Sequence, residues 1–222
     1  MKELLQKLET EGPALSQRVL SDMYRDPFWL ERFGSKGRRH ADEDSDFHLR
    51  YLARAIASGD PAVLVRYARW LREVLATRGM CTRHLDENFR RLGEAIAGED
   101  WPSGELALGF LGAARESLEW KEGPAGALER DAERLAKSIE RAGLEEASRD
   151  LVSYLIDAVA LERPDLFAAH VAWMQAHLER HGSNPVAWPA VVDALADVLD
   201  RSDSHREARE CVRAALEAKE PS

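Results

Sequence analysis

The chain has 222 residues, of which 45% are hydrophobic and 32% charged, and its formal net charge is −9. Its length is sufficient for a buried core in one large domain or two small ones. The acidic balance argues against nucleic acid as the main partner, because phosphate binding needs clustered Lys and Arg.

The first third of the chain predicts a series of helices, because apolar residues recur at helical spacing and no alternating strand pattern is found. A short helix ends at Gly12, and a second one ends before Pro27. Residues 28–33 predict one aromatic-rich helical turn, and residues 34–37, Gly-Ser-Lys-Gly, predict a flexible loop. A long helix is expected from about residue 40 to residue 58.

The next helix is predicted from its ends, with Asp60 as N-cap, Pro61 in the first turn and Gly79 after the last. The inward stripe expected for it is Leu64, Tyr67, Trp70, Leu71 and Val74. Another helix begins at Thr82, residues 98–103 predict a junction, and helical patterns continue through the second half.

A stretch of the first half recurs in the second half at a constant offset of 103 residues, the difference between positions 51 and 154. The matched pairs are Tyr51/Tyr154, Leu52/Leu155, Ala55/Ala158, Ile56/Val159, Pro61/Pro164, Trp70/Trp173, Leu75/Leu178, Gly79/Gly182 and Leu92/Leu195. Paired Trp, Tyr, Pro and Gly in one gapless register indicate a duplicated helical unit. We therefore predict an all-α, internally duplicated antiparallel helical bundle, with residues 1–100 and 101–222 as two domains or one fused body.

The two halves differ in the residues that precede the repeat. His40, Asp44 and His48 are spaced i, i+4 and i+8, so they lie on one face of a helix whose row continues as core positions. His48 aligns with Leu151 of the second half. One interpretation is a metal or ligand site formed by these three side chains, to which Glu43, His84 or Glu87 could add a group. The other is that His40 and Asp44 lie at an exposed helix start and His48 is a core histidine.

Further candidates surround this row. The aromatic residues Phe28, Trp29 and Phe33 have no counterpart in the second half, and they fit either a lid over a pocket or a hydrophobic plug. The neighbouring Arg39 suits an anionic ligand group, although an exposed helix face is the commoner setting for arginines. The predicted ligand-binding residues are Trp29, Arg39, His40, Asp44, His48 and Tyr51.

A second group of histidines comprises His170, His177 and His181. The last two precede a terminating glycine, where cationic side chains favour the helix end. His170 aligns with Tyr67 as a lining position, and a haem-ligand role for it is the alternative. The sequence contains no nucleophile elbow, phosphate-binding glycine loop or supported Ser-His-Asp arrangement, which favours a non-catalytic protein with no cofactor that we can name.

The cysteines Cys81 and Cys211 form no Cys-x-x-Cys motif, so reduced thiols in a cytoplasmic protein are expected. The N-terminus has no signal-peptide pattern, and no stretch approaches the roughly 18 apolar residues of a membrane span. We therefore expect no membrane partner.

Residues 51–61, 67–69, 76–80 and the helix from Leu85 resemble the RsbR-type helical sensor domains, which are globin-like bundles without haem in stress-signalling and histidine-kinase proteins. The shared features are a helix, a Gly-Asp-Pro break, a helix ending in Arg-x-Gly and a further helix, and they recur more faintly over residues 154–199. The chain departs from the family in its duplication and in having no recognisable output domain. The resemblance implies signal-responsive binding and dimerisation, and it carries over no active-site residues.

Two functions follow as hypotheses. The first is a sensory or regulatory protein that binds a small ligand or a protein partner through the first repeat, with a homodimer implied by the resemblance. The alternative is a metal-dependent bundle of the oxidase or oxygen-binding type, with His40, Asp44 and His48 as ligands. A purely structural role is a third reading of the same sequence.

Overall fold

The computed structural model of the protein describes residues 1–141, 143–181, 187–201 and 204–217. All regular secondary structure in these residues is helical, which confirms the all-α class. None of the described helices is both long and apolar enough to cross a membrane.

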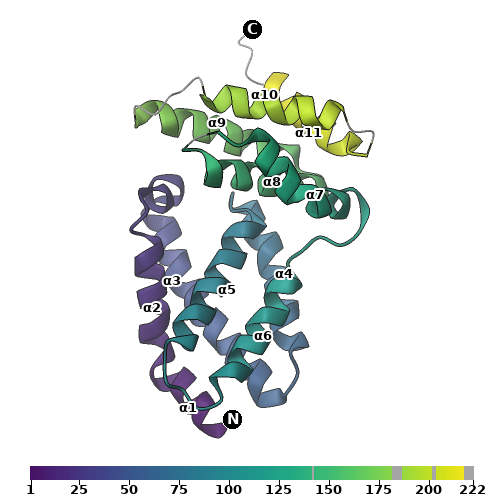
Figure 1. The fold of residues 1–222 in the computed structure, drawn as a ribbon. Helices are drawn as coiled ribbons and strands as arrows, with labels where there is room; N and C mark the ends of the chain where they lie inside the picture. Colours follow the sequence, from purple (N-terminus) through teal and green to yellow (C-terminus); the bar gives the residue numbers. More distant parts are fainter. Residues whose placement is uncertain (142, 182–186, 202–203, 218–222) are drawn as a thin grey trace. The chain divides into compact units, whose positions relative to one another are not determined.

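Figure 1 shows the order of the helices along the chain. They are α1 (Lys2–Thr10), α2 (Gly12–Met23), α3 (Pro27–Ser58), α4 (Ala62–Thr77), α5 (Thr82–Ala97), α6 (Gly104–Glu116), α7 (Gly123–Ile139), α8 (Glu145–Ala160), α9 (Pro164–Arg180), α10 (Ala187–Asp200) and α11 (Arg206–Glu217).

The helices form two compact units. The first consists of residues 1–71 and 84–118, and the second consists of residues 72–83 and 119–222, as far as these are described. Helix α6 belongs to the first unit, so the division does not coincide with the junction predicted at residues 98–103. The division falls within α4, whose residues up to Leu71 belong to the first unit.

The first unit is built around α3. Helices α1, α2 and α6 all pack against α3, as Figure 1 shows for α2. Apolar residues at helical spacing supply its core, and the fully buried ones include Leu15, Leu20, Leu52, Ile56, Leu64, Leu71, Leu85 and Phe89. Burial of one such side chain stabilises the fold by about 1.5–3 kcal/mol.

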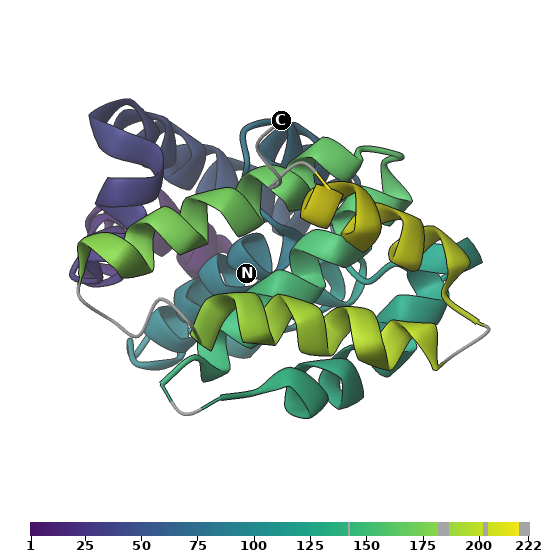
Figure 2. The same cartoon turned by 90° about the horizontal axis from the view of Figure 1, so that it is seen from above.

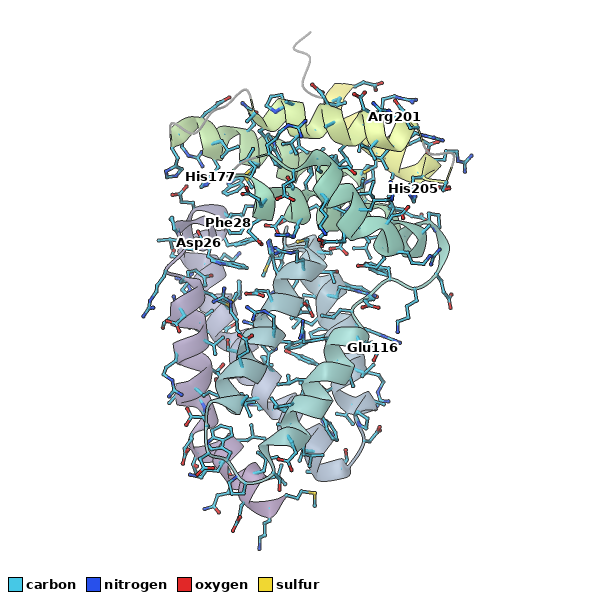
Figure 3. The ribbon with its side chains drawn as sticks, in the orientation of Figure 1. Asp26, Phe28, Glu116, His177, Arg201 and His205 are labelled. Carbon is cyan, nitrogen blue, oxygen red and sulfur yellow. The ribbon has the colours of Figure 1, made fainter. Side chains whose placement is uncertain are left out.

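The helix ends in this unit follow the capping residues of the sequence. The Asp26 carboxylate accepts the backbone N–H of Phe28 at 2.9 Å, and Figure 3 labels both residues. The Asp60 carboxylate accepts the N–H of Ala62 at 2.9 Å at the start of α4, which confirms the predicted cap. Gly79, after the end of α4, has a φ of +81°.

The prediction of a flexible loop at residues 34–37 is wrong, because α3 continues through these residues with a kink at Gly34. Gly34 has φ +65° and ψ −172°, a conformation that is essentially restricted to glycine. Gly37 lies one turn further on, and a Cβ on it would come within 2.4 Å of the Phe33 Cβ. Gly34 therefore kinks the helix, and Gly37 leaves room for the Phe33 side chain. Neither glycine ends the helix.

The second unit contains α7 to α11 together with residues 72–83. Helix α8 packs against α7, α9 and α11, and Figure 2 shows α9, α10 and α11 along their lengths. The core of the second unit contains fully buried side chains, which include Tyr154, Leu155, Phe167, Trp188, Leu195 and Leu199. The indole N–H of Trp188 donates to the Val171 carbonyl at 3.1 Å, so this buried polar group is satisfied.

The kink in α3 yields a stability prediction. Gly34→Ala should lower the free energy of unfolding by about 1–3 kcal/mol, because alanine is strained at a positive φ with ψ near 180°. The measurement is chemical denaturation, with Gly109→Ala as the matched control. Gly109 is an exposed residue within α6 with no atom near its Cβ position, so alanine there should stabilise by up to about 1 kcal/mol. Equal stability of Gly34→Ala and the wild type would show that the kink is not required.

Candidate functional site

His48 lies in the core of the first unit, where it joins α3 to α4. Its side chain is 5% exposed, and its Nδ1 lies 2.8 Å from the Tyr67 hydroxyl. The imidazole also makes an edge contact with Phe89 of α5, with ring centroids 5.0 Å apart. His48 is therefore buried within a set of aromatic rings contributed by three helices.

The protonation states of this pair are complementary. Burial lowers the pKa of His48 to about 3, so the imidazole is neutral at pH 7. Burial also raises the pKa of Tyr67 above its usual range, and the negative charge of Asp44 adds to that shift. The phenol therefore keeps its proton and can donate it to the neutral Nδ1 of His48.

His40 and Asp44 have surroundings different from those of His48. The side chain of His40 is 39% exposed, and its Nδ1 lies 3.5 Å from a carboxylate oxygen of Glu43. Asp44 is half-buried and is close enough to Tyr67 to influence its pKa. Within the described part of the chain, no group of three metal-ligating atoms lying within 4.8 Å of one another includes His40, Asp44 or His48. A metal site formed by these three residues stays a prediction.

The aromatic residues near the start of α3 pack around His84. The ring centroids of Phe28, Trp29 and Phe33 lie 5.6, 5.0 and 6.4 Å from that of His84, which is buried. Trp29 thus takes part in an aromatic cluster of the first unit. Arg39 is exposed on α3, close in sequence to this cluster.

The histidines of α9 stack on aromatic rings of the second unit. His170 is fully buried against Tyr154, with ring centroids 3.9 Å apart and an interplanar angle of 15°. His177 stacks on Trp173 at 4.8 Å. The His181 ring lies 4.7 Å from that of His177, just beyond the end of α9.

Tyr51, the remaining predicted site residue, leads to a distinct surface feature. It stacks on Tyr67 with ring centroids 4.1 Å apart and an interplanar angle of 12°. It is half-buried and lines a shallow pocket of about 350 Å³ between α3 and α4. The residues lining this pocket are Tyr51, Arg54, Val63, Arg66, Tyr67 and Trp70.

The spacing of the pocket residues explains why they share one surface. Phe47, Arg50, Tyr51 and Arg54 follow at i, i+3, i+4 and i+7 on α3, and Val63, Arg66, Tyr67 and Trp70 repeat this spacing on α4. We call Phe47, Arg50, Tyr51, Arg54, Arg66 and Trp70 the basic–aromatic face. The buried His48–Tyr67 hydrogen bond lies directly beneath it, because Tyr67 lines the pocket and also contacts His48.

The arginines of the basic–aromatic face carry unneutralised charge. Among the residues that the structure describes, no carboxylate lies within 4.0 Å of the guanidinium groups of Arg50, Arg54 or Arg66. Arg50 lies over the ring of Phe47, with 5.6 Å between its Cζ and the ring centroid. In a chain of net charge −9, this is a local cationic surface.

The prediction that Trp70 belongs to the core is wrong. Its side chain is 59% exposed, and Phe47 is 45% exposed. The Trp70 ring contacts Tyr67, with centroids 6.2 Å apart, at the edge of the pocket. Sequence reasoning missed Arg54, Arg66 and Trp70 as site residues, although their helical spacing with Tyr51 was available as a signal.

A second pocket, of about 280 Å³, lies between α5 and α6 in the same unit. Its arginines are neutralised, unlike those of the basic–aromatic face. Arg90 pairs with Glu87 at 2.6 Å, and Arg115 pairs with Asp86 at 2.7 Å. This pocket therefore offers little free charge for an ionic ligand.

Comparison of the chain with protein-family models, with curated proteins and with solved structures found no match.

The buried histidine yields a pH prediction. The pKa of His48 is about 3 in the folded protein against an ordinary value of 6.5, so unfolding takes up a proton below pH 6.5. Its contribution to stability is complete above pH 6.5 and is lost as the pH falls from 6.5 toward 3. The free energy of unfolding should therefore fall by up to about 1.4 kcal/mol per pH unit more in the wild type than in His48→Leu.

The measurement is chemical denaturation of both proteins at several pH values between pH 7.5 and pH 5. At the slope given above, free energies of unfolding measured one pH unit apart should differ by about 1 kcal/mol or more. Leucine stands at the corresponding position 151, so His48→Leu should fold. His40→Gln is the control, because His40 is 39% exposed. A difference between the wild type and His48→Leu that does not change with pH would contradict a buried, neutral imidazole.

Proposed function

We propose that the protein is a non-catalytic helical regulatory protein that binds an anionic ligand or partner through the basic–aromatic face of its first unit. The observation that carries this proposal is a set of three exposed arginines without carboxylate partners among the described residues, beside exposed aromatic rings, with two of the arginines lining a pocket. Guanidinium groups bind carboxylates and phosphates in bidentate fashion, and exposed aromatic rings add stacking and apolar contact.

We also propose that the chain is internally duplicated and that this face belongs to the first copy. The bounds of α8, α9, α10 and α11 agree, to within a few residues, with those of the end of α3 and of α4, α5 and α6 shifted by 103 residues. Gly182, one of the matched residues, lies outside the described part of the chain.

A ring stack that recurs at the same offset supports the duplication. Tyr51 stacks on Tyr67 at 4.1 Å and 12°, and the corresponding residues Tyr154 and His170 stack at 3.9 Å and 15°. Positions 67 and 170 carry different residues, so they were not among the matched pairs of the sequence. The shared stack therefore supports the duplication in addition to the sequence match. It joins the same two helices of each proposed copy.

The regulatory part of the proposal follows the resemblance to RsbR-type sensor domains, which implies signal-responsive binding and dimerisation. Dimerisation of this chain is accordingly part of the proposal. The metal-dependent alternative draws no additional support from the described geometry, in which His40 and His48 have separate partners, Glu43 and Tyr67.

Anion binding can be tested by retention on immobilised heparin at low ionic strength. The wild type should be retained despite its net charge of −9, because the local cationic face and not the net charge governs the contact. The variant Arg50→Gln/Arg54→Gln/Arg66→Gln should pass through the column. Retention of the wild type should fall steeply with added salt, since the contact is exposed and ionic.

The matched control is Arg130→Gln/Arg213→Gln, which removes two exposed arginines of the second unit. It should be retained like the wild type. Equal retention of the wild type and the triple variant, or no retention of either, would overturn the assignment of anion binding to this face.

A further inference from the structure

The second unit contains a helix face that corresponds to the basic–aromatic face, and this second face is occupied. The offset of 103 residues relates Phe47, Arg50, Tyr51 and Arg54 of α3 to Asp150, Ser153, Tyr154 and Asp157 of α8. Of these four α8 residues, all but Ser153 are buried. What covers them is a stretch of polypeptide, residues 79–83, which belongs to the second unit.

Each of the four α8 residues bonds to that stretch. The Tyr154 hydroxyl donates to the Gly79 carbonyl at 2.6 Å. One Asp157 oxygen accepts the Thr82 backbone N–H at 2.6 Å, and the other accepts the Thr82 hydroxyl at 2.7 Å.

The remaining two bonds involve Arg83. Its guanidinium donates to Asp150 at 2.6 Å, and its backbone N–H donates to Ser153 at 3.3 Å. Glu146, one turn earlier on α8, also pairs with this guanidinium. The α8 face is thus a polypeptide-docking face in which Asp150, Ser153 and Asp157 accept hydrogen bonds from the segment and Tyr154 donates one to it.

The basic–aromatic face has the opposite polarity at the same positions. Tyrosine is retained at 51, but arginine replaces Ser153 and Asp157 at positions 50 and 54. Arg66 adds a third donor where α9 carries Ala169. A segment such as residues 79–83 would not fit there, because the backbone N–H groups of Arg83 and Thr82 would face the guanidinium donors of Arg50 and Arg54 where α8 offers acceptors. Carboxylates would instead complete the pairing.

From this comparison we infer that the basic–aromatic face docks an acidic polypeptide segment of a partner protein. Carboxylates of the segment pair with Arg50, Arg54 and Arg66, and one of its backbone carbonyls accepts the Tyr51 hydroxyl, as the Gly79 carbonyl accepts that of Tyr154. The exposed ring of Trp70 provides the apolar contact at the edge of the pocket. This inference rests on the proposed anion-binding function and names the chemical class of its partner.

The test is isothermal titration calorimetry of the full chain with unlabelled peptides, because common fluorescent labels are themselves aromatic anions. The probe is the peptide Glu-Glu-Trp-Glu-Glu, and its neutral counterpart is Gln-Gln-Trp-Gln-Gln. The acidic peptide should bind the wild type and lose about tenfold in affinity in Arg54→Gln/Arg66→Gln, as expected for two exposed ion pairs. The control Arg130→Gln/Arg213→Gln should match the wild type, and the neutral peptide should bind neither.

The alternative partners are tested in the same way with AMP and with an oligothymidylate of ten nucleotides. Arginine-dependent binding of either one without binding of the acidic peptide would overturn the peptide inference but leave the proposed anion-binding function standing. Absence of arginine-dependent binding for every probe would overturn both. Equal binding of the acidic and neutral peptides would show that charge does not select the partner, and it would also overturn the inference.

Discussion

The hydrogen bond between His48 and Tyr67 connects the core of the first unit to its surface. It forms between a phenol that retains its proton and an imidazole that remains neutral, so no buried charge has to be compensated. Loss of one partner would leave the other polar group buried and unsatisfied, at a cost of about 1–3 kcal/mol. This bond and the stack on Tyr51 hold the Tyr67 ring from two sides at the floor of the shallow pocket.

The same interaction bears on how the arginines of the basic–aromatic face are spaced. Arg54 and Arg66 come from different helices, and their spacing depends on how α3 and α4 pack against each other. The tyrosine stack sets that packing at the level of the pocket. A guanidinium that already lies near its binding geometry loses less conformational entropy when a carboxylate binds. The core interaction therefore bears on the spacing of Arg54 and Arg66 even though His48 itself is 5% exposed.

The sequence was informative where local chemistry decides the structure. The all-α class followed from apolar periodicity, the start of α4 from the cap at Asp60, and the inward position of His48 from its alignment with Leu151. Sequence reasoning failed where tertiary packing decides. Glycines at 34 and 37 resemble a loop, yet the stretch is helical with a kink at Gly34, and local glycine content alone does not distinguish a kink from a loop.

The error at Trp70 has the same origin and explains why the site was only partly found. A tryptophan at a helical core spacing is usually buried, and the sequence gives no information about which neighbouring helix is absent on that side. The exposure of Trp70 and its position beside Arg54 and Arg66 depend on how α3 and α4 pack together, which the sequence alone does not determine. Of the residues predicted from sequence, Tyr51 is the one that lines this pocket.

Under the proposed duplication, the two corresponding helix faces differ in the hydrogen-bonding groups that they offer. Ser153 and Asp157 of α8 accept the N–H groups of Arg83 and Thr82, whereas Arg50 and Arg54 of α3 offer no acceptor to such groups. Arginines in place of Ser153 and Asp157 thus favour carboxylates on the α3 face, which is the chemistry of the partner proposed for it.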